Sequence, residues 1–328
     1  MTTAPGRHTT GGMNGSGGDA ERASLGRAAS RPAPDPSAPS RAMYPFAPFP
    51  TAAYRLSGVL LVITCVASGL TFADHGILTG PAVMNGSARG TALVLLAATA
   101  PVMAAAMVLA ARGSVRAIVV WLGALASVLY NAQMLLYATP FNRLFLTYVA
   151  MLGLAVWSII LLLRHRAVTQ LAARIDDGMP IRAIATYTMI IAVLNTLIWL
   201  RTIVPALLAD TPSSFLQGMG LTTSPTFIQD LALWLPLMIV GSVWLLRRRP
   251  WGYLLVGALL VTWVLEGASI AADQWFAHQA DPASPEASLA MVPAFAALAV
   301  VTLLPLYFFL RHVSPVPVGR GDHGVQRG

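Results

Sequence analysis

Apolar residues fill eight stretches of the chain, separated by short segments rich in Arg, Gly, Pro, Asp and Ser. A helix needs about 20 mostly apolar residues to cross the hydrocarbon core of a bilayer, so each stretch predicts one spanning helix. The predicted spans are 54–73, 91–111, 116–138, 144–163, 183–208, 226–246, 251–272 and 289–310. This pattern predicts an all-α fold, a polytopic transmembrane helical bundle of about eight spans over residues 51–312.

The two ends of the chain lack this pattern. Residues 1–50 are rich in Gly, Ser, Pro, Ala and Arg without an apolar period, so a disordered tail is expected there. Residues 313–328 predict a second, shorter tail. The first apolar run is long enough to span a membrane, which favours an uncleaved signal-anchor over a cleaved signal peptide, and Met43 is an alternative start.

Composition agrees with a lipid environment. Apolar residues make up 56% of the 328 and charged residues only 10%, which is too apolar for an ordinary soluble domain. The net charge of +8 does not require nucleic acid, because a polytopic protein becomes basic by keeping arginine on its cytoplasmic loops. We therefore expect the bilayer as a partner and no nucleic acid. Cys65 is the only cysteine, which excludes an intramolecular disulfide and a thiolate metal cluster.

The arginines predict the orientation of the chain. All but three of the 21 lie in the tails or in alternate links between spans, and the exceptions are Arg89 and Arg143 in the opposite loops and Arg201 inside a span. Because positive loops stay on the cytoplasmic side, both termini are predicted to lie in the cytoplasm, with the spans in the cytoplasmic membrane. An even number of spans agrees with this orientation.

Short similarities suggest a four-plus-four repeat of parallel halves. "LLLRHR" at 161–166 ends the fourth predicted span, and "FFLRHV" at 308–313 ends the eighth. "WLGALASVL" at 121–129 likewise resembles "LVGALLVTW" at 255–263. Halves with an even number of spans share their orientation, as in transporters built from parallel repeats. Chance similarity between apolar helices is the alternative.

Arg201 and Glu266 are the candidate buried ion pair. Arg201 lies seven residues before the end of the fifth predicted span, a depth of about 10 Å at 1.5 Å per residue. A charge at that depth needs a partner or a wet cavity. Glu266 lies at a similar depth in the seventh span, and Asp273 shares its helical face at a spacing of seven. We expect the two charges to meet inside the bundle.

Other spans add polar residues to the same outward-facing layer. The candidates for a ligand or ion pathway are Arg201, Glu266, Asn195, Asn131, Asp230, Asp273, Gln133 and Asn142. Ser224 and Pro225 predict an N-cap and first turn for the sixth span. Polar residues that only join helices are the alternative reading of this layer.

No pattern of a known catalytic, metal or cofactor site occurs. The sequence has no GxSxG, P-loop, HExxH or dinucleotide motif, so no catalytic or metal-ligating residue and no cofactor is predicted. All six histidines lie in predicted tails and loops, which argues against a haem bundle.

The segments "YNAQMLLYATPFNRLFLTYVAMLGL" (130–154) and "SPTFIQDLALWLPLMIVGSVWLLRRRPWGYLL" (224–255) resemble a loose group of uncharacterised polytopic prokaryotic integral membrane proteins. This resemblance implies a membrane bundle and no particular activity.

Three functions remain open from the sequence. The first is binding or transport of a small solute, ion or lipid headgroup through the polar layer. The second is a membrane-embedded enzyme acting on a lipid-linked substrate, with Glu266 or Asp230 as acid or base. The third is a non-catalytic assembly or sensory subunit whose N-terminal tail contacts a protein partner of unknown identity.

Overall fold

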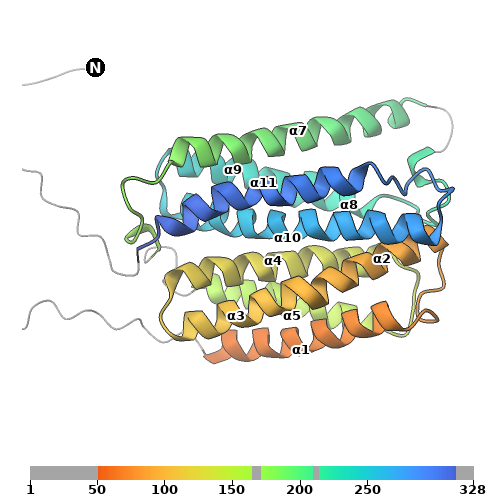
Figure 1. Ribbon diagram of the computed structural model, residues 1–328, viewed down its shortest axis with the longest axis horizontal. Coiled ribbons are helices and arrows are strands. Elements are labelled where there is room, and N and C mark those ends of the chain that lie inside the picture. Colours follow the sequence, from red (N-terminus) through yellow and green to blue (C-terminus); the bar gives the residue numbers. More distant parts are fainter. Residues whose placement is uncertain (1–50, 165–170, 210–213, 315–328) are drawn as a thin grey trace, which may run out of the picture. The chain divides into compact units, whose positions relative to one another are not determined.

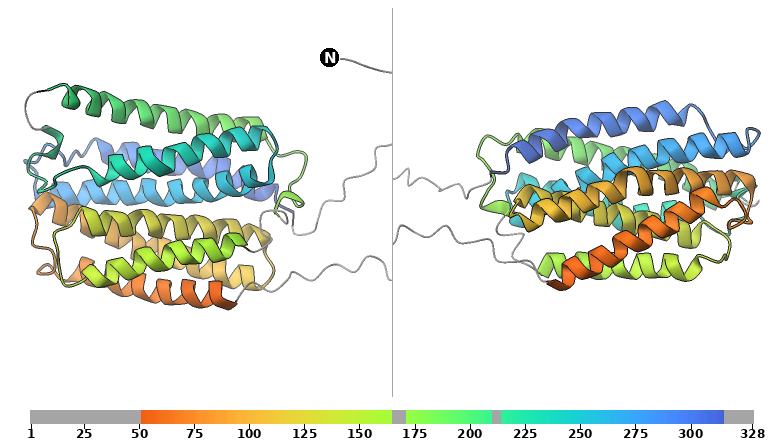
Figure 2. Two further views of the ribbon diagram at one scale, coloured as in Figure 1. Left: turned by 180° about the vertical axis from the view of Figure 1, so that it is seen from behind. Right: turned by 60° about the horizontal axis from the view of Figure 1, so that its bottom comes forward.

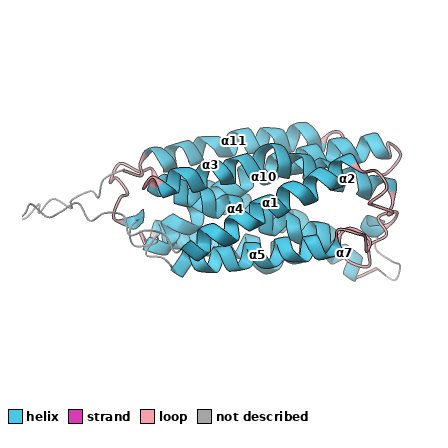
Figure 3. Cartoon of the chain, turned by 90° about the horizontal axis from the view of Figure 1, so that it is seen from below, coloured by secondary structure: helices cyan, strands magenta, loops and turns pink. Residues whose placement is uncertain are grey.

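The computed structural model describes residues 51–164, 171–209 and 214–314, in which every regular element is a helix (Figures 1 and 3). Eight helical spans in these ranges are long and apolar enough to cross a membrane, which confirms the predicted polytopic helical membrane protein. The predictions for residues 1–50 and 315–328, including the start at Met43, lie outside the described residues. The elements are α1 (Thr51–Ala73), α2 (Ala82–Val94), η1 (Leu95–Thr99), α3 (Ala100–Ala111), α4 (Val115–Tyr137), α5 (Phe145–Arg164), α7 (Ile181–Leu207), η2 (Ser214–Leu216), α8 (Pro225–Gln229), η3 (Asp230–Trp234), α9 (Leu235–Leu246), α10 (Pro250–Ala280) and α11 (Met291–Arg311).

The spans run back and forth along one direction, so the loops gather at two ends (Figure 3). One end carries the described links 112–114, 171–180 and 247–249 and is called the arginine-rich end. The other carries the links 74–81 and 281–290 and is called the arginine-poor end. Every span connects one end with the other.

Helix α10 lies where the first four and the last four spans meet. The helices between residues 51 and 164 lie side by side, as do those between 181 and 311, in each view of Figures 1 and 2. Across this junction α10 packs against α2 and α4, and within its own half it packs against α9 and α11. Residues on α10 are therefore among the most buried in the bundle.

Glycines allow α2 and α4 to approach the backbone of α10. A Cβ at Gly123 would lie 2.5 Å from the carbonyl oxygen of Ala258, and one at Gly90 would lie 2.4 Å from that of Ala272. Small residues permit such close packing between membrane helices. The second span begins at Ala82, nine residues before its predicted start, because Asn85, Ser87 and Arg89 make its first two turns less apolar than the rest of the span.

Two spans contain a π-helical turn that the sequence did not predict. η1 is followed by Pro101 and η3 by Pro236, each at the second position of the next α-helix. Proline has no N–H and its ring clashes with the carbonyl four residues earlier, and a widened turn accommodates both effects. The predicted N-cap of the sixth span is confirmed, since Ser224 Oγ accepts a hydrogen bond from the Phe227 amide.

Candidate functional site

Glu266 is the centre of a buried polar cluster between α4 and α10. Its side chain is 1% exposed. Its Oε1 accepts hydrogen bonds from Ser127 Oγ at 2.7 Å and from Asn131 Nδ2 at 2.8 Å. These two donors are four residues apart on α4 and so share one helical face. Glu266 Oε2 is also buried but has no hydrogen-bond partner among the described residues.

Asp230 brings a second carboxylate into the bundle from the π-helix η3. Its Oδ2 accepts a hydrogen bond of 2.9 Å from Trp199 Nε1 on α7, and the Tyr130 hydroxyl of α4 also hydrogen-bonds to this carboxylate. Its Oδ1 is buried without a partner among the described residues. A π-turn shifts the register of a helix, and such turns are frequent at functional sites.

Asp273 is a third carboxylate, two helical turns beyond Glu266 on the same face of α10. Seven residues along a helix correspond to a rise of about 10 Å. Its side chain hydrogen-bonds to Ser87 of α2. Its Oδ1 has no partner in the described part of the chain.

The three carboxylates come from two elements, since Glu266 and Asp273 share one face of α10 and Asp230 lies on η3. No arginine or histidine whose side chain is described is buried, so no basic side chain shares their interior. An unpaired carboxylate in a low-dielectric interior is very unfavourable. Each free carboxylate oxygen therefore requires a proton, a cation or water.

The predicted ion pair between Arg201 and Glu266 is wrong. Arg201 lies on an exposed face of α7, whereas Glu266 is buried and bonded to Ser127 and Asn131. Arg201 is six residues before the end of α7 at Leu207, a rise of about 9 Å. A long arginine side chain can extend over such a distance to the lipid headgroups, so it needs no buried partner.

The other predicted residues divide into two groups. Gln133 Oε1 is buried without a hydrogen-bond partner among the described residues. Asn142 instead stabilises the link before α5, because its Oδ1 accepts from the Leu144 amide and its Nδ2 donates to the Pro140 carbonyl. Asn195 is half-buried on α7 and is not joined to the three carboxylates by a described hydrogen bond.

The polar cluster lies in the half of the bundle nearer the arginine-poor end. Asn131 is six residues, about 9 Å, from the end of α4 at Tyr137. Before Ser127, the buried part of α4 consists of Val, Ala, Ile, Leu, Gly and Trp residues. At the arginine-rich end, Arg116 Nε donates to the Val313 carbonyl at 2.7 Å and ties α4 to the end of α11. On α4, the side of the cluster towards the arginine-rich end is therefore apolar.

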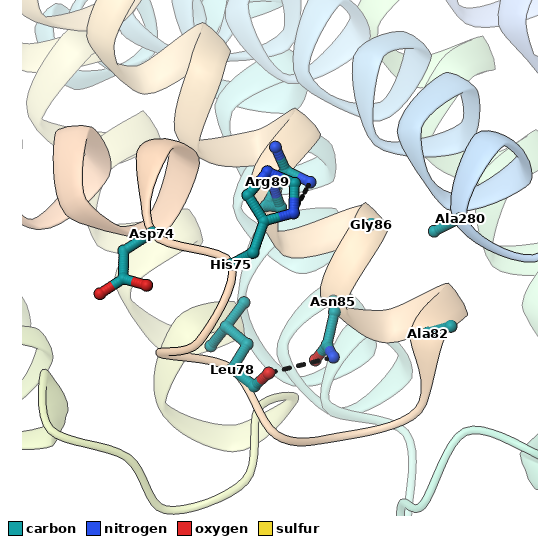
Figure 4. Close-up of a pocket in the computed structure, with 8 residues that line it drawn as sticks. All are labelled: Asp74, His75, Leu78, Ala82, Asn85, Gly86, Arg89 and Ala280. Carbon is teal, nitrogen blue, oxygen red and sulfur yellow. Dashed lines mark hydrogen bonds between the residues drawn. The ribbon is translucent and has the colours of Figure 1, made fainter.

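A pocket of about 170 Å³ lies at the arginine-poor end (Figure 4). It is lined by the α1–α2 link, the first turns of α2 and the last residue of α10. The lining residues are Asp74, His75, Leu78, Ala82, Asn85, Gly86, Arg89 and Ala280.

Sequence reasoning missed Ser127, Ser87 and this pocket. Ser127 lies four residues before Asn131 within a buried apolar helix, and that spacing was a usable signal. No comparable spacing pointed to Ser87 and Arg89, because both fall in a segment that was predicted to be a loop.

The described residues contain no group of three or more His, Cys, Asp or Glu side chains that could hold a metal ion. Outside the spans, burial raises the pKa of Glu286 in the link between α10 and α11. Glu286 is half-buried in a loop, so it is a control position for the carboxylates Glu266, Asp230 and Asp273.

Comparisons with protein families, with curated proteins and with solved structures each found no match to this chain.

Proposed function

We propose that this protein binds a cation, in the first instance a proton, at Glu266, Asp230 and Asp273 and couples that binding to the transport of a small solute. The observation that carries this proposal is a set of three carboxylates, the buried Glu266 and Asp230 and the half-buried Asp273, each with one buried oxygen that has no partner among the described residues. No described arginine or histidine is buried. Intramembrane ionisable residues that face the bundle interior mark ion and proton pathways in many membrane proteins.

A proton suits this geometry better than a metal ion. Hard metal cations need about six oxygen ligands around one point. Here each carboxylate offers one free oxygen, and the three are spread over two turns of α10 and over η3. One proton per carboxylate neutralises the charge and occupies one oxygen.

The location of the cluster supports alternating access. The polar residues of α4 lie towards the arginine-poor end, whereas its buried residues before Ser127 are apolar. We infer from this asymmetry that a bound cation exchanges with solution at the arginine-poor end. Release to the opposite side requires a rearrangement of α4 against α10.

We place the arginine-rich end in the cytoplasm and both chain termini with it. The support is the distribution of arginine, since only Arg89 and Arg143 occur in the links at the other end. In this orientation, in a cytoplasmic membrane, the carboxylates face the exterior.

We also propose that the spans form two parallel four-span repeats. A step of 135 residues separates the first residues of η1 and η3, Pro101 from Pro236, and Asn131 from Glu266. The similar segments 121–129 and 255–263 differ from this step by one residue, and 161–166 and 308–313 differ from it by twelve. Asn131 and Glu266 also touch each other. Contact between equivalent residues is expected where an axis along the membrane normal relates two parallel repeats. In this reading Glu266 is the charged counterpart of Asn131.

Charge displacement on a solid-supported membrane tests the cation site without knowledge of the solute. Proteoliposomes of the full chain should give a transient current after a pH jump, and Glu266→Gln should reduce it at least tenfold. Glu286→Gln is the matched control and should leave the current unchanged. A current after a sodium jump at constant pH, but none after a pH jump, would identify sodium instead of the proton as the bound cation. Absence of both currents in the wild type, or an unchanged current in Glu266→Gln, overturns the proposal.

A further inference from the structure

The pocket at the arginine-poor end is lined by one guanidinium, Arg89, and one carboxylate, Asp74, and no described ion pair joins the two. Arg89 Nε donates to the Phe72 carbonyl at 3.2 Å, and its Nη1 lies 3.1 Å from His75 Nδ1. The guanidinium also lies 5.7 Å from the centre of the Phe72 ring. Figure 4 shows the Asp74 carboxylate pointing away from Arg89, and its Oδ1 accepts a hydrogen bond from the Gly76 amide. Asp74 therefore stabilises the turn instead of pairing with Arg89.

The contact between Arg89 and His75 decides which N–H groups of the two side chains remain free to donate. A guanidinium has five N–H groups and no acceptor, so His75 Nδ1 must accept and the ring proton must be on Nε2. Two of the five arginine N–H groups are used, by Phe72 and by His75. The remaining guanidinium donors and His75 Nε2–H are available to an acceptor.

The other polar side chain of the pocket adds no free donor. Asn85 Nδ2 donates to the carbonyl oxygens of Leu78 and Gly80, which holds the link against α2. The charge and the available donors thus both favour a ligand that accepts hydrogen bonds and carries negative charge. A planar carboxylate matches the forked guanidinium, because two parallel N–H bonds can form.

The size of the pocket limits the ligand. The pocket has a volume of about 170 Å³. Drug-sized ligands occupy pockets of about 300 Å³ or more. The pocket therefore suits an anion of only a few carbon atoms.

One turn of α2 joins this pocket to the carboxylate group. Gly86 and Arg89 line the pocket, Ser87 between them hydrogen-bonds to Asp273, and Gly90 packs against the backbone of Ala272 and Asp273. A negative ligand at Arg89 strengthens cation binding at Asp273 by Coulomb attraction. By linkage, a cation at Asp273 strengthens anion binding by the same factor.

We propose that this pocket binds a small oxyanion, such as a monocarboxylate, through Arg89 and His75, and that this anion is the solute coupled to the cation site. The coupling rests on the proposed function, whereas anion binding does not. The same chemistry would recognise the phosphate of a lipid headgroup, so the experiment separates the two sources.

Saturation-transfer difference NMR on the full chain in zwitterionic nanodiscs tests the site with acetate as the probe. Acetate should bind, acetamide of the same shape should not, and inorganic phosphate should compete. Arg89→Gln should weaken acetate binding at least tenfold, and His75→Gln should weaken it severalfold. Arg143→Gln removes another arginine at the same end and should leave binding unchanged. Arg89→Lys retains the charge without the fork and tests the site if Arg89→Gln fails to fold.

The outcomes distinguish this proposal from the cation site. Acetate binding that persists in Glu266→Gln while the charge displacement is lost supports two separate sites. Loss of acetate binding when phosphatidylglycerol is added to the nanodiscs identifies a lipid phosphate as the ligand and contradicts a soluble anion. Equal binding of acetate and acetamide, or unchanged binding in both Arg89 variants, overturns the anion site.

Discussion

Helices α7 and α10 are both long apolar spans, and each carries an ionisable side chain among apolar residues, Arg201 in α7 and Glu266 in α10. Their surroundings are opposite. In the most apolar part of α10, 72% of the residues are buried inside the bundle, compared with 6% in α7. The charge on α7 therefore faces outward and can extend to the headgroups, whereas the charge on α10 is enclosed by protein.

Small residues account for much of this difference. α10 contains Gly257 and Gly267, where an added Cβ would lie 2.6 Å from the Phe309 ring and 2.9 Å from Ala299 Cβ. α7 has no glycine and presents large aliphatic side chains such as Leu194, Leu197 and Ile198 at its exposed surface. Close packing without cavities requires small residues at helix contacts. Residue size, more than mean hydropathy, separates the enclosed helix from the peripheral one.

The largest expected effect comes from separating α4 and α10. Gly123→Leu would place side-chain atoms against the Ala258 carbonyl and is expected to lower the free energy of unfolding by about 3 kcal/mol. Gly153→Leu in α5 is the matched control, because its Cβ would meet no atom within 4 Å. Unfolding in sodium dodecyl sulfate measures both variants. Equal stability of the two would contradict the tight junction at α10.

Replacing an asparagine on the enclosed helix α4 should cost more stability than replacing one on the peripheral helix α7. Asn131→Ala removes a donor to Glu266 and is expected to lower the free energy of unfolding by about 1 kcal/mol. Asn195→Ala, on α7, removes no described hydrogen bond and should change it by only a few tenths of a kcal/mol. The same unfolding assay compares them. A larger loss for Asn195→Ala would show that α7 contributes to the polar cluster.

Removing the exposed arginine should have a smaller effect. Arg201→Gln is expected to change the free energy of unfolding by less than about 0.5 kcal/mol, because the side chain has no buried partner. Glu266→Arg should lower the yield of folded protein, and Arg201→Glu should not rescue it. Yields of folded protein on size exclusion measure this series. Recovery of the folded yield in the double variant would support the predicted ion pair between Arg201 and Glu266.

The smallest effect concerns pH and the link between α10 and α11. Burial raises the pKa of Glu286 in the folded state, so folding favours its protonated form. This contribution to stability is present below the ordinary pKa of glutamate and is lost as the pH rises through the higher folded value. Glu286→Gln should remove this part of the pH dependence. Thermal unfolding of both proteins across that range measures it, and identical pH profiles would exclude the effect.

Local signals predicted much of the architecture and part of the site. Ser224 was recognised as an N-cap from its position before Pro225, and Glu266 and Asp273 were placed on one face by their spacing. The π-turn at Asp230 was not predicted, because its cause, Pro236, is also compatible with a simple kink. Arg201 was predicted to be the partner of Glu266 because the sequence indicates how deep a residue lies along its helix. It does not indicate how the helix is rotated about its axis.

The sequence by itself determined the number of spans and the uneven distribution of arginine between the two ends. These properties depend on transfer of each segment from water to lipid, which is a sum over its own residues. Only the tertiary structure decided which faces are enclosed. That choice depends on how closely α2, α4 and α10 approach one another, and it placed Glu266 beside Asn131, Asp273 beside Ser87, and Arg201 on the outer surface. Lipid and protein interior are equally apolar, so hydropathy cannot separate them, whereas residue size and hydrogen-bond pairing can.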